Sequence, residues 1–236
     1  MLWFARHLDS VLRPLFVSCM RLFLRRTMIS TKLSLKPNEY YQQTFQKDLI
    51  VLHFTAGGTA AGAVNWWSSD RGASKVATAY IVDLDGTVYQ TFAPKFWAFH
   101  LGTSSAKLER RSIGIEIVNW GPLRLDPTDR TKLNSWPRNW LNPFCRFEER
   151  DRYVHKLWRG EQFWMAYPQA QVAAIRDLVA TLTRDFSIPT QLPPASKLME
   201  FDSLFFASFC GVAAHHNFRV DKTDVGPAFN WATLGI

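Results

Sequence analysis

The chain has 236 residues, of which 47% are hydrophobic, and carries a formal net charge of +8 at neutral pH. This length and apolar fraction suit one large domain with its own core. The three cysteines are odd in number and form no Cys-x-x-Cys pair, which argues against a disulfide framework and a thiolate zinc finger. The positive charge indicates an anionic partner, which can be a nucleic acid, a membrane surface or an anionic cell-wall polymer.

The first segment, residues 1–27, is apolar and basic, and its five arginines interrupt the hydrophobic runs. Its longest uncharged stretch, Pro14 to Met20, is too short to cross a bilayer and short for a signal peptide. Two interpretations stay open: a helix that lies on a membrane surface, or an unfolded extension before a start at Met28. We therefore expect the folded domain to occupy residues 28–236.

Two predicted strand regions follow. The apolar run LIVLHF at 49–54 predicts a buried strand that places His53 at its end. The glycine-rich sequence after it predicts a turn into a helix. Residues 77–92 predict two strands joined around Asp85-Gly86, because Asp-Gly is a strong hairpin signal.

The second half continues this alternation. Residues 112–120 predict a buried strand that carries one acid, Glu116, whereas residues 121–167 predict a long irregular surface insertion rich in Trp, Arg and Pro. Apolar residues at steps of three and four in 168–186 predict an amphipathic helix, and 210–215 predict a last strand. Because strands and helices interleave without an internal repeat, we expect the α/β class, as a single domain with a central mixed sheet flanked by helices.

Residues 215–229, HHNFRVDKTDVGPAF, place histidines, a lysine and a carboxylate beside a Gly-Pro turn. Hydrolytic zinc sites commonly take three ligands from His, Asp, Glu or Cys and leave a fourth position open. His53 and His215, each at a predicted strand end, could meet Asp224 from the following loop. From spacing alone, a metal site and ordinary packed side chains both stay open.

Five blocks of sequence occur in the order found in the type 2 N-acetylmuramoyl-L-alanine amidases, a family that includes phage endolysins and the peptidoglycan recognition proteins. The blocks are LIVLHFTAGG, AYIVDLDGTVYQTF, WAFHLG, RSIGIEIVNWGPL and HHNFRVDKTDVGPAF. The chain resembles this family over roughly residues 49–231. The resemblance implies a mixed sheet flanked by helices, with one zinc ion in a surface groove.

The resemblance also implies a set of zinc ligands. His53, His215 and Asp224 stand where the family has its two histidine ligands and its Asp or Cys ligand. His215 is preferred over His216, because the family's second ligand histidine is followed by a variable residue and then Asp or Asn. We therefore expect one Zn²⁺ ion in each chain.

Catalytic roles are implied for two residues. Lys222 resembles the lysine that stabilises the tetrahedral oxyanion, and Glu116 resembles an acid near the metal-bound water. The alternative for Glu116 is a carboxylate that is merely solvated at a strand end. The chain departs from the family at Ala79, where many members have a histidine, although Tyr80 beside it remains. Proton transfer is therefore expected to fall to Glu116 and Lys222.

Substrate contacts are expected from a histidine and several aromatic residues. His100, in WAFHLG, loosely matches a family block and is interpreted as a substrate or transition-state contact, with a packed structural histidine as the alternative. Aromatic rings can stack on sugars or pack in a core. The aromatic candidates are Tyr80, Trp97 and Trp120, with Trp136 and Trp140 in the predicted insertion.

The expected activity is zinc-dependent hydrolysis of the amide bond between N-acetylmuramic acid and L-alanine in peptidoglycan or a muropeptide. A non-catalytic recognition module of the same fold is the alternative, although such a module would lack a ligand or the acid. No nucleic-acid partner is expected, because the sequence has no RNP or helix-turn-helix signature. We expect a monomer that acts on the cell wall from the periplasm, after secretion or during phage lysis, with residues 1–27 assisting contact with membrane surfaces.

Overall fold

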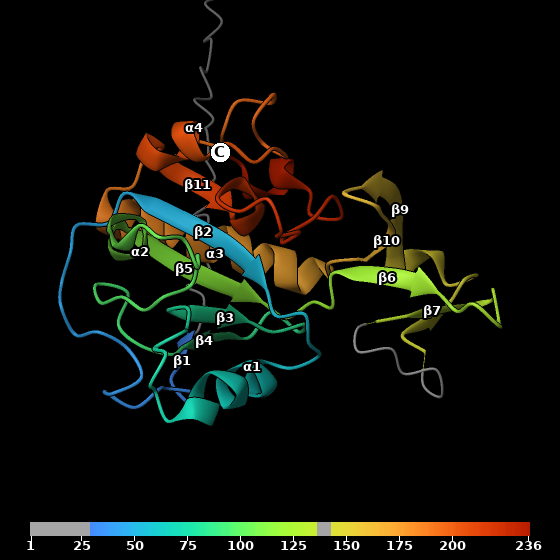
Figure 1. The fold of residues 1–236 in the computed structure, drawn as a ribbon, viewed down its shortest axis with the longest axis horizontal. Coiled ribbons are helices and arrows are strands. Elements are labelled where there is room, and N and C mark those ends of the chain that lie inside the picture. The colour runs from blue at the N-terminus through green and yellow to red at the C-terminus, as the bar shows by residue number, and fades with distance from the viewer. Residues whose placement is uncertain (1–28, 136–142) are drawn as a thin grey trace, which may run out of the picture.

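The computed structural model describes residues 29–135 and 143–236 (Figure 1). The expected N-terminal extension, residues 1–27, lies outside the described residues, as do Trp136 and Trp140. Across the described part of the chain, no helix combines the length and the apolar character that a bilayer crossing needs.

A six-stranded sheet forms the centre of the molecule. Its strands are β1 (Ile29–Ser30), β2 (Leu49–Phe54), β3 (Tyr80–Val82), β4 (Val88–Gln90), β5 (Ser112–Ile117) and β11 (Gly211–Ala214). They lie in the order β1-β4-β3-β5-β2-β11. All neighbouring pairs are parallel except β3 and β4, which are antiparallel. The predicted central mixed sheet is therefore confirmed, including the hairpin around Asp85-Gly86.

Helices cover both faces of this sheet. They are α1 (Ala60–Trp67), α2 (Ala106–Arg111), α3 (Gln169–Phe186) and α4 (Ser203–Ser208), with short 3-10 turns at η1 (Ser68–Asp70), η2 (Arg150–Arg152), η3 (His215–Asn217) and η4 (Trp231–Leu234). The apolar stripe of α3 packs with Ile113, Ile115 and Ile117 of β5 on one face. On the other face, Leu49 and Val51 of β2 pack with side chains from α2 and α4.

Alternation along the strands decides which face carries the candidate residues. Side chains two positions apart in a strand point to the same side of the sheet. His53 therefore shares the α2 and α4 face with Val51, and Glu116 is its direct register partner on β5. His215 follows β11 two positions after Ala213, which packs on the same face.

Residues 121–167 differ from the prediction of an irregular insertion. They contain a second sheet with strands β6 (Pro122–Leu125), β7 (Lys132–Asn134), β8 (Cys145–Arg146), β9 (Tyr153–Trp158) and β10 (Glu161–Met165). The order is β8-β7-β6-β10-β9, and every neighbouring pair is antiparallel. Its strands have two to six residues, and exposed side chains such as Leu157 break the alternation that would have revealed them.

Candidate metal centre

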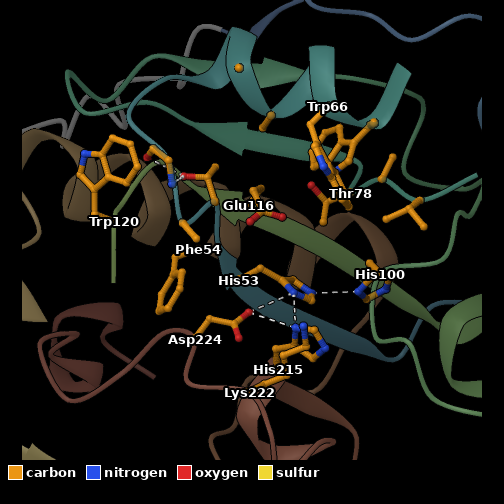
Figure 2. A pocket seen from close by; sticks show the side chains of 18 of the residues that line it. His53, Phe54, Trp66, Thr78, His100, Glu116, Trp120, His215, Lys222 and Asp224 are labelled. Atoms are coloured by element: carbon orange, nitrogen blue, oxygen red, sulfur yellow. Dashed lines mark hydrogen bonds and ion pairs between the residues drawn. The ribbon is translucent and has the colours of Figure 1, made fainter. Parts of the chain in front are cut away.

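The candidate residues meet at the carboxyl ends of the parallel strands β2, β5 and β11 (Figure 2). His53 is the fifth residue of β2, Glu116 is the fifth residue of β5, and His215 directly follows β11. The loop after η3 brings Asp224 and Lys222 to the same place. Together they line one wall of a groove with a volume of about 960 Å³. The predicted surface groove is therefore present.

Three potential ligand atoms converge within this groove. The Nδ1 atoms of His53 and His215 are 3.0 Å apart, and Oδ2 of Asp224 lies 3.3 Å from the first and 3.1 Å from the second. Two ligands of a tetrahedral zinc ion, each about 2.0–2.1 Å from the metal, are about 3.3–3.4 Å apart. The three spacings thus fit one face of a zinc coordination tetrahedron.

Hydrogen bonds around His53 fix which of its ring nitrogens carries hydrogen. Ser112 donates its hydroxyl hydrogen to the carbonyl of Leu108, so its oxygen must accept from Nε2 of His100, 2.7 Å away. The bare Nδ1 of His100 then accepts from Nε2 of His53 at 2.9 Å. In a neutral His53 this leaves Nδ1 without hydrogen and directed at the centre.

His215 reaches the same state by a shorter route. Its Nε2 lies 2.8 Å from the carbonyl oxygen of Leu101, and a carbonyl can only accept, so Nε2 carries the hydrogen. In a neutral His215, Nδ1 is therefore bare as well. Three lone pairs from His53, His215 and Asp224 then face one another with no hydrogen between them. Such an arrangement is repulsive unless a cation lies among them, and two imidazoles with a carboxylate are a donor set that zinc prefers.

Electrostatics favour the protonation states that a metal needs. Burial, reinforced by the neighbouring His215, lowers the pKa of His53 to about 4. Burial also holds the pKa of His100 well below its usual value, so both rings are neutral near pH 7. Burial would raise the pKa of Asp224, but the positive charge of His215 when that ring is protonated, together with hydrogen bonds from His215 and His53, outweighs burial and holds that pKa below its usual range. Neutral imidazole and ionised carboxylate are the metal-binding forms.

Glu116 and Lys222 lie beside the three ligand atoms and line the groove with them. Glu116 is only 9% exposed. Burial, reinforced by the negative charge of Asp224 and opposed by the ammonium of Lys222, raises the pKa of Glu116 to about 8. The solvated carboxylate considered as the alternative for Glu116 therefore does not describe its surroundings.

Sequence comparison decides the family of the chain. The profile of the N-acetylmuramoyl-L-alanine amidase family matches residues 43–227. The chain belongs to this family. The match covers β2 through the Gly-Pro turn after Asp224, and thus every residue of the metal centre. No curated protein matches the sequence.

Several solved structures are similar in fold. The amidase AmiD from E. coli, in complex with anhydro-N-acetylmuramic acid-L-Ala-D-gamma-Glu-L-Lys, is 17% identical, with a TM-score of 0.49, over 82% of this chain and 58% of that one. AmpDh3 from Pseudomonas aeruginosa is 19% identical with a TM-score of 0.48, over 86% and 65% of the two chains. The endolysin LysCS from Clostridium intestinale is 13% identical with a TM-score of 0.46, over 83% and 87%. The family assignment rests on the sequence profile alone.

His100 lines the groove together with the candidate ligands, so its role as a substrate contact stays a prediction (Figure 2). Its two ring nitrogens bond to His53 and Ser112, so the ring orients a candidate metal ligand. Gly114 makes this possible, because a methyl group there would lie 3.1 Å from Nδ1 of His100. Glu109 holds the same loop by accepting from the backbone N–H groups of residues 100–102.

Tyr80 and Trp97 do not reach the groove, which corrects their prediction as substrate contacts. Tyr80 is 3% exposed in the main core, where burial raises the pKa of its hydroxyl to about 12. Trp97 is 4% exposed and stacks on Tyr41, with ring centroids 4.0 Å apart. Both are packing residues, because neighbouring segments cover their rings.

The groove is lined by Trp120, whose role as a substrate contact stays a prediction, and by Trp66, which the sequence analysis did not single out (Figure 2). Trp66 is 67% exposed on α1, where a tryptophan ring in solvent has no packing role to explain it. Trp120 packs on the Gly57-Gly58 turn, since a methyl group at Gly58 would lie 3.1 Å from its ring. No pattern in the sequence distinguishes Trp66 from its neighbour Trp67, which is 8% exposed and faces the core.

His216 lies outside the cluster of ligand atoms and has a different role. Its ring nitrogens lie 2.8 Å from the carbonyl oxygen of Asp224 and 3.0 Å from that of Leu198. The ring is fully buried. Of the two adjacent histidines, the structure therefore turns His215 toward the centre and uses His216 to hold the loop.

Proposed function

We propose that this chain is a zinc-dependent amidase that cleaves the bond between N-acetylmuramic acid and L-alanine in peptidoglycan. The family assignment supports the reaction class. The observation that carries zinc dependence is the convergence of three hydrogen-free ligand atoms from His53, His215 and Asp224 within 3.3 Å of one another. When bound, zinc would polarise the scissile carbonyl and make a water molecule nucleophilic near neutral pH.

Glu116 is proposed as the group that accepts a proton from the attacking water and passes it to the leaving amine. It faces the groove from the strand next to His53. It must be ionised to accept a proton, and burial, followed by the charge of Asp224, opposes ionisation. A positive charge that neutralises Asp224 would lower the pKa of Glu116 toward the ionised form.

Lys222 is proposed to stabilise the negative oxygen that develops on the scissile carbonyl. Its side chain lines the groove beside the ligand atoms, and its charge reaches both His53 and Glu116. A fixed positive charge at this position favours the transition state over the neutral amide, and removing one such donor costs about 3–4 kcal/mol of transition-state stabilisation.

The groove itself supports a glycan-bearing substrate. Trp66 and Trp120 present aromatic faces on which the apolar faces of sugar rings can stack. The net charge of +8 supports contact with an anionic wall. We therefore propose that the protein degrades cell walls as a monomer, in the manner of an endolysin.

Product analysis tests this function. Purified protein is incubated with purified peptidoglycan, with and without a chelator, and the free stem peptides are identified by mass spectrometry. We expect stem peptides with an N-terminal L-alanine, loss of activity with the chelator, and recovery on adding zinc. Asp224→Ala should lose both the metal and the activity, whereas the exposed Asp185→Ala on α3 should keep both.

Two results would overturn the proposal. Cleavage that survives complete metal removal would exclude zinc dependence. Binding to peptidoglycan without any cleavage, in protein that holds one zinc ion per chain, would identify a recognition module instead.

A further inference from the structure

The second sheet contacts the metal-site loop through the tip of its β9–β10 hairpin. Arg159 and Gly160 form the turn, with φ angles of 47° and 80°. Type I′ hairpin turns need positive φ at both central residues, which Gly160 adopts freely and Arg159 adopts at a cost. That cost suggests that the side chain of Arg159 is required at this position.

The guanidinium of Arg159 is surrounded by backbone carbonyls of one loop. It donates to the carbonyl oxygen of Val220 at 3.1 Å, of His216 at 3.3 Å and of Arg219 at 3.5 Å, and also to that of Lys222. These four carbonyls come from the seven residues 216–222. A guanidinium offers five donors in a rigid fork, so one side chain can fix several carbonyl directions at once.

This loop connects two metal ligands and carries the candidate oxyanion lysine. It begins at His215 in η3, contains Lys222 and ends at Asp224. Carbonyls at the end of so short a helix have no partner inside it. In the described part of the chain, Arg159 makes no ion pair within 4 Å, so the close contacts of its guanidinium with polar groups are with these carbonyls.

Neighbouring aromatic residues of the same segment contact this loop and the turn that follows Asp224. Trp158 contacts the ring of His216 edge-on, with centroids 5.1 Å apart. The ring of Trp164 lies against Gly226, where a methyl group would be 2.8 Å from it. Tyr167, just after β10, donates its hydroxyl hydrogen to the carbonyl of Val225 at 2.7 Å. The hairpin and the metal-site loop therefore form one packed unit.

We propose that Arg159 is a positioning residue that holds the loop of residues 216–222 so that Lys222 and Asp224 face the groove. This assigns a role in the reaction to the second sheet, which contributes neither metal ligand nor acid. The part that concerns Lys222 rests on the proposed function, whereas the part that concerns Asp224 depends only on metal binding.

Two substitutions and a matched control test this inference in the full-length protein. Arg159→Ala removes the donors, and Arg159→Lys keeps the charge without the planar fork. Arg124→Ala removes an arginine from the same sheet, whose ion-pair partner among the described residues is Glu161, at the surface. Zinc affinity is measured by competition with a chromophoric chelator, and the cobalt-substituted proteins are compared by visible absorption.

We expect Arg159→Ala to weaken zinc binding by about 10–100-fold, the usual effect of losing a group that supports a metal ligand. Its cobalt spectrum should change, and kcat on soluble muropeptide should fall more than KM rises. Arg159→Lys should keep part of the zinc affinity, of the cobalt spectrum and of kcat. Guanidinium added to Arg159→Ala, far below denaturing concentrations, should restore part of the same properties. Sodium at equal ionic strength should not. Arg124→Ala should behave as wild type.

Wild-type zinc affinity and an unchanged cobalt spectrum in folded Arg159→Ala would overturn the inference. So would a loss that neither lysine nor guanidinium restores, because that pattern indicates general destabilisation. If Arg159→Ala does not fold, the same measurements are made on Arg159→Lys. Wild-type zinc affinity and a wild-type cobalt spectrum in Arg159→Lys would contradict a role for the planar guanidinium. Zinc affinity and cobalt absorption need no substrate, so failure of the proposed amidase activity would leave both readouts interpretable.

Discussion

A histidine binds a metal only through a ring nitrogen without hydrogen, so hydrogen positions on the site histidines matter as much as the distances between them. His100 never faces the centre with a free nitrogen, yet its bond to His53 directs the hydrogen of that ligand away from the centre. Leu101 does the same for His215 through its carbonyl. At the residue scale, the centre is prepared by groups that are not ligands.

Glu116→Gln separates proton transfer from metal binding. Glutamine keeps the size of the side chain but cannot accept a proton, and Glu116 is not among the three ligands. We expect one zinc ion per chain to remain while kcat falls by about 10²–10⁴-fold, the usual contribution of a positioned acid–base group. Elemental analysis and steady-state kinetics measure the two effects. An unchanged kcat would mean that the proton travels through another group.

The same substitution makes a prediction about pH and stability in the metal-free protein. Burial, and then the charge of Asp224, raises the pKa of Glu116 in the folded state from 4.5 to about 8. Between these values the folded chain holds a proton that the unfolded chain has released. The resulting stabilisation is complete below about pH 4.5 and is lost as the pH rises through about 8.

Glu116→Gln lacks this titration, so its stability relative to wild type should increase between pH 5 and pH 8. The change should exceed about 1.4 kcal/mol, the equivalent of one pKa unit. Urea unfolding of both proteins in the presence of a chelator measures the difference, and groups that titrate equally in both cancel. An equal difference at the two pH values would show that Glu116 is ionised in the folded protein.

At the scale of elements, patterns along the sequence located the strands that carry the ligands but not the direction of every side chain. The apolar run ending in His53 and the one ending before His215 were predicted, because buried parallel strands are continuous and apolar. In such a strand the sequence does not show which side chains face the groove. Tyr80 is an example, because its strand is buried on both sides. Trp97 was misassigned because Tyr41, distant in sequence, covers it.

The second sheet shows a different limit of sequence patterns. Its strands are short, and the contact between Arg159 and the loop joins residues about sixty positions apart. A turn sequence such as Trp-Arg-Gly-Glu predicts a bend, but it does not predict which distant segment the turn contacts. The roles of Arg159 and of the exposed Trp66 therefore emerge only from the packed structure.

At the scale of the whole molecule, much of the positive charge lies in residues 1–27, before the first strand of the described fold. Residues 1–27 contain five arginines and one aspartate, so they carry half of the net charge of +8. The described chain continues from them into β1, which pairs with β4 at one edge of the central sheet. The strand next to His215, β11, forms the opposite edge. The N-terminal segment thus joins the fold far along the sheet from the metal centre.

A protein that begins at Met28 should therefore fold, bind zinc and cleave soluble muropeptide at the full-length rate. It should lose association with vesicles that contain anionic lipids, because the five arginines of residues 1–27 are removed. Such exposed charges attract an anionic surface over about 8 Å at physiological ionic strength. The loss should be largest at low salt, where that range is longer. Vesicle co-sedimentation and muropeptide kinetics at two salt concentrations measure both properties. If the shortened protein loses zinc or muropeptide cleavage, residues 1–27 belong to the folded core and the domain boundary at residue 28 is wrong.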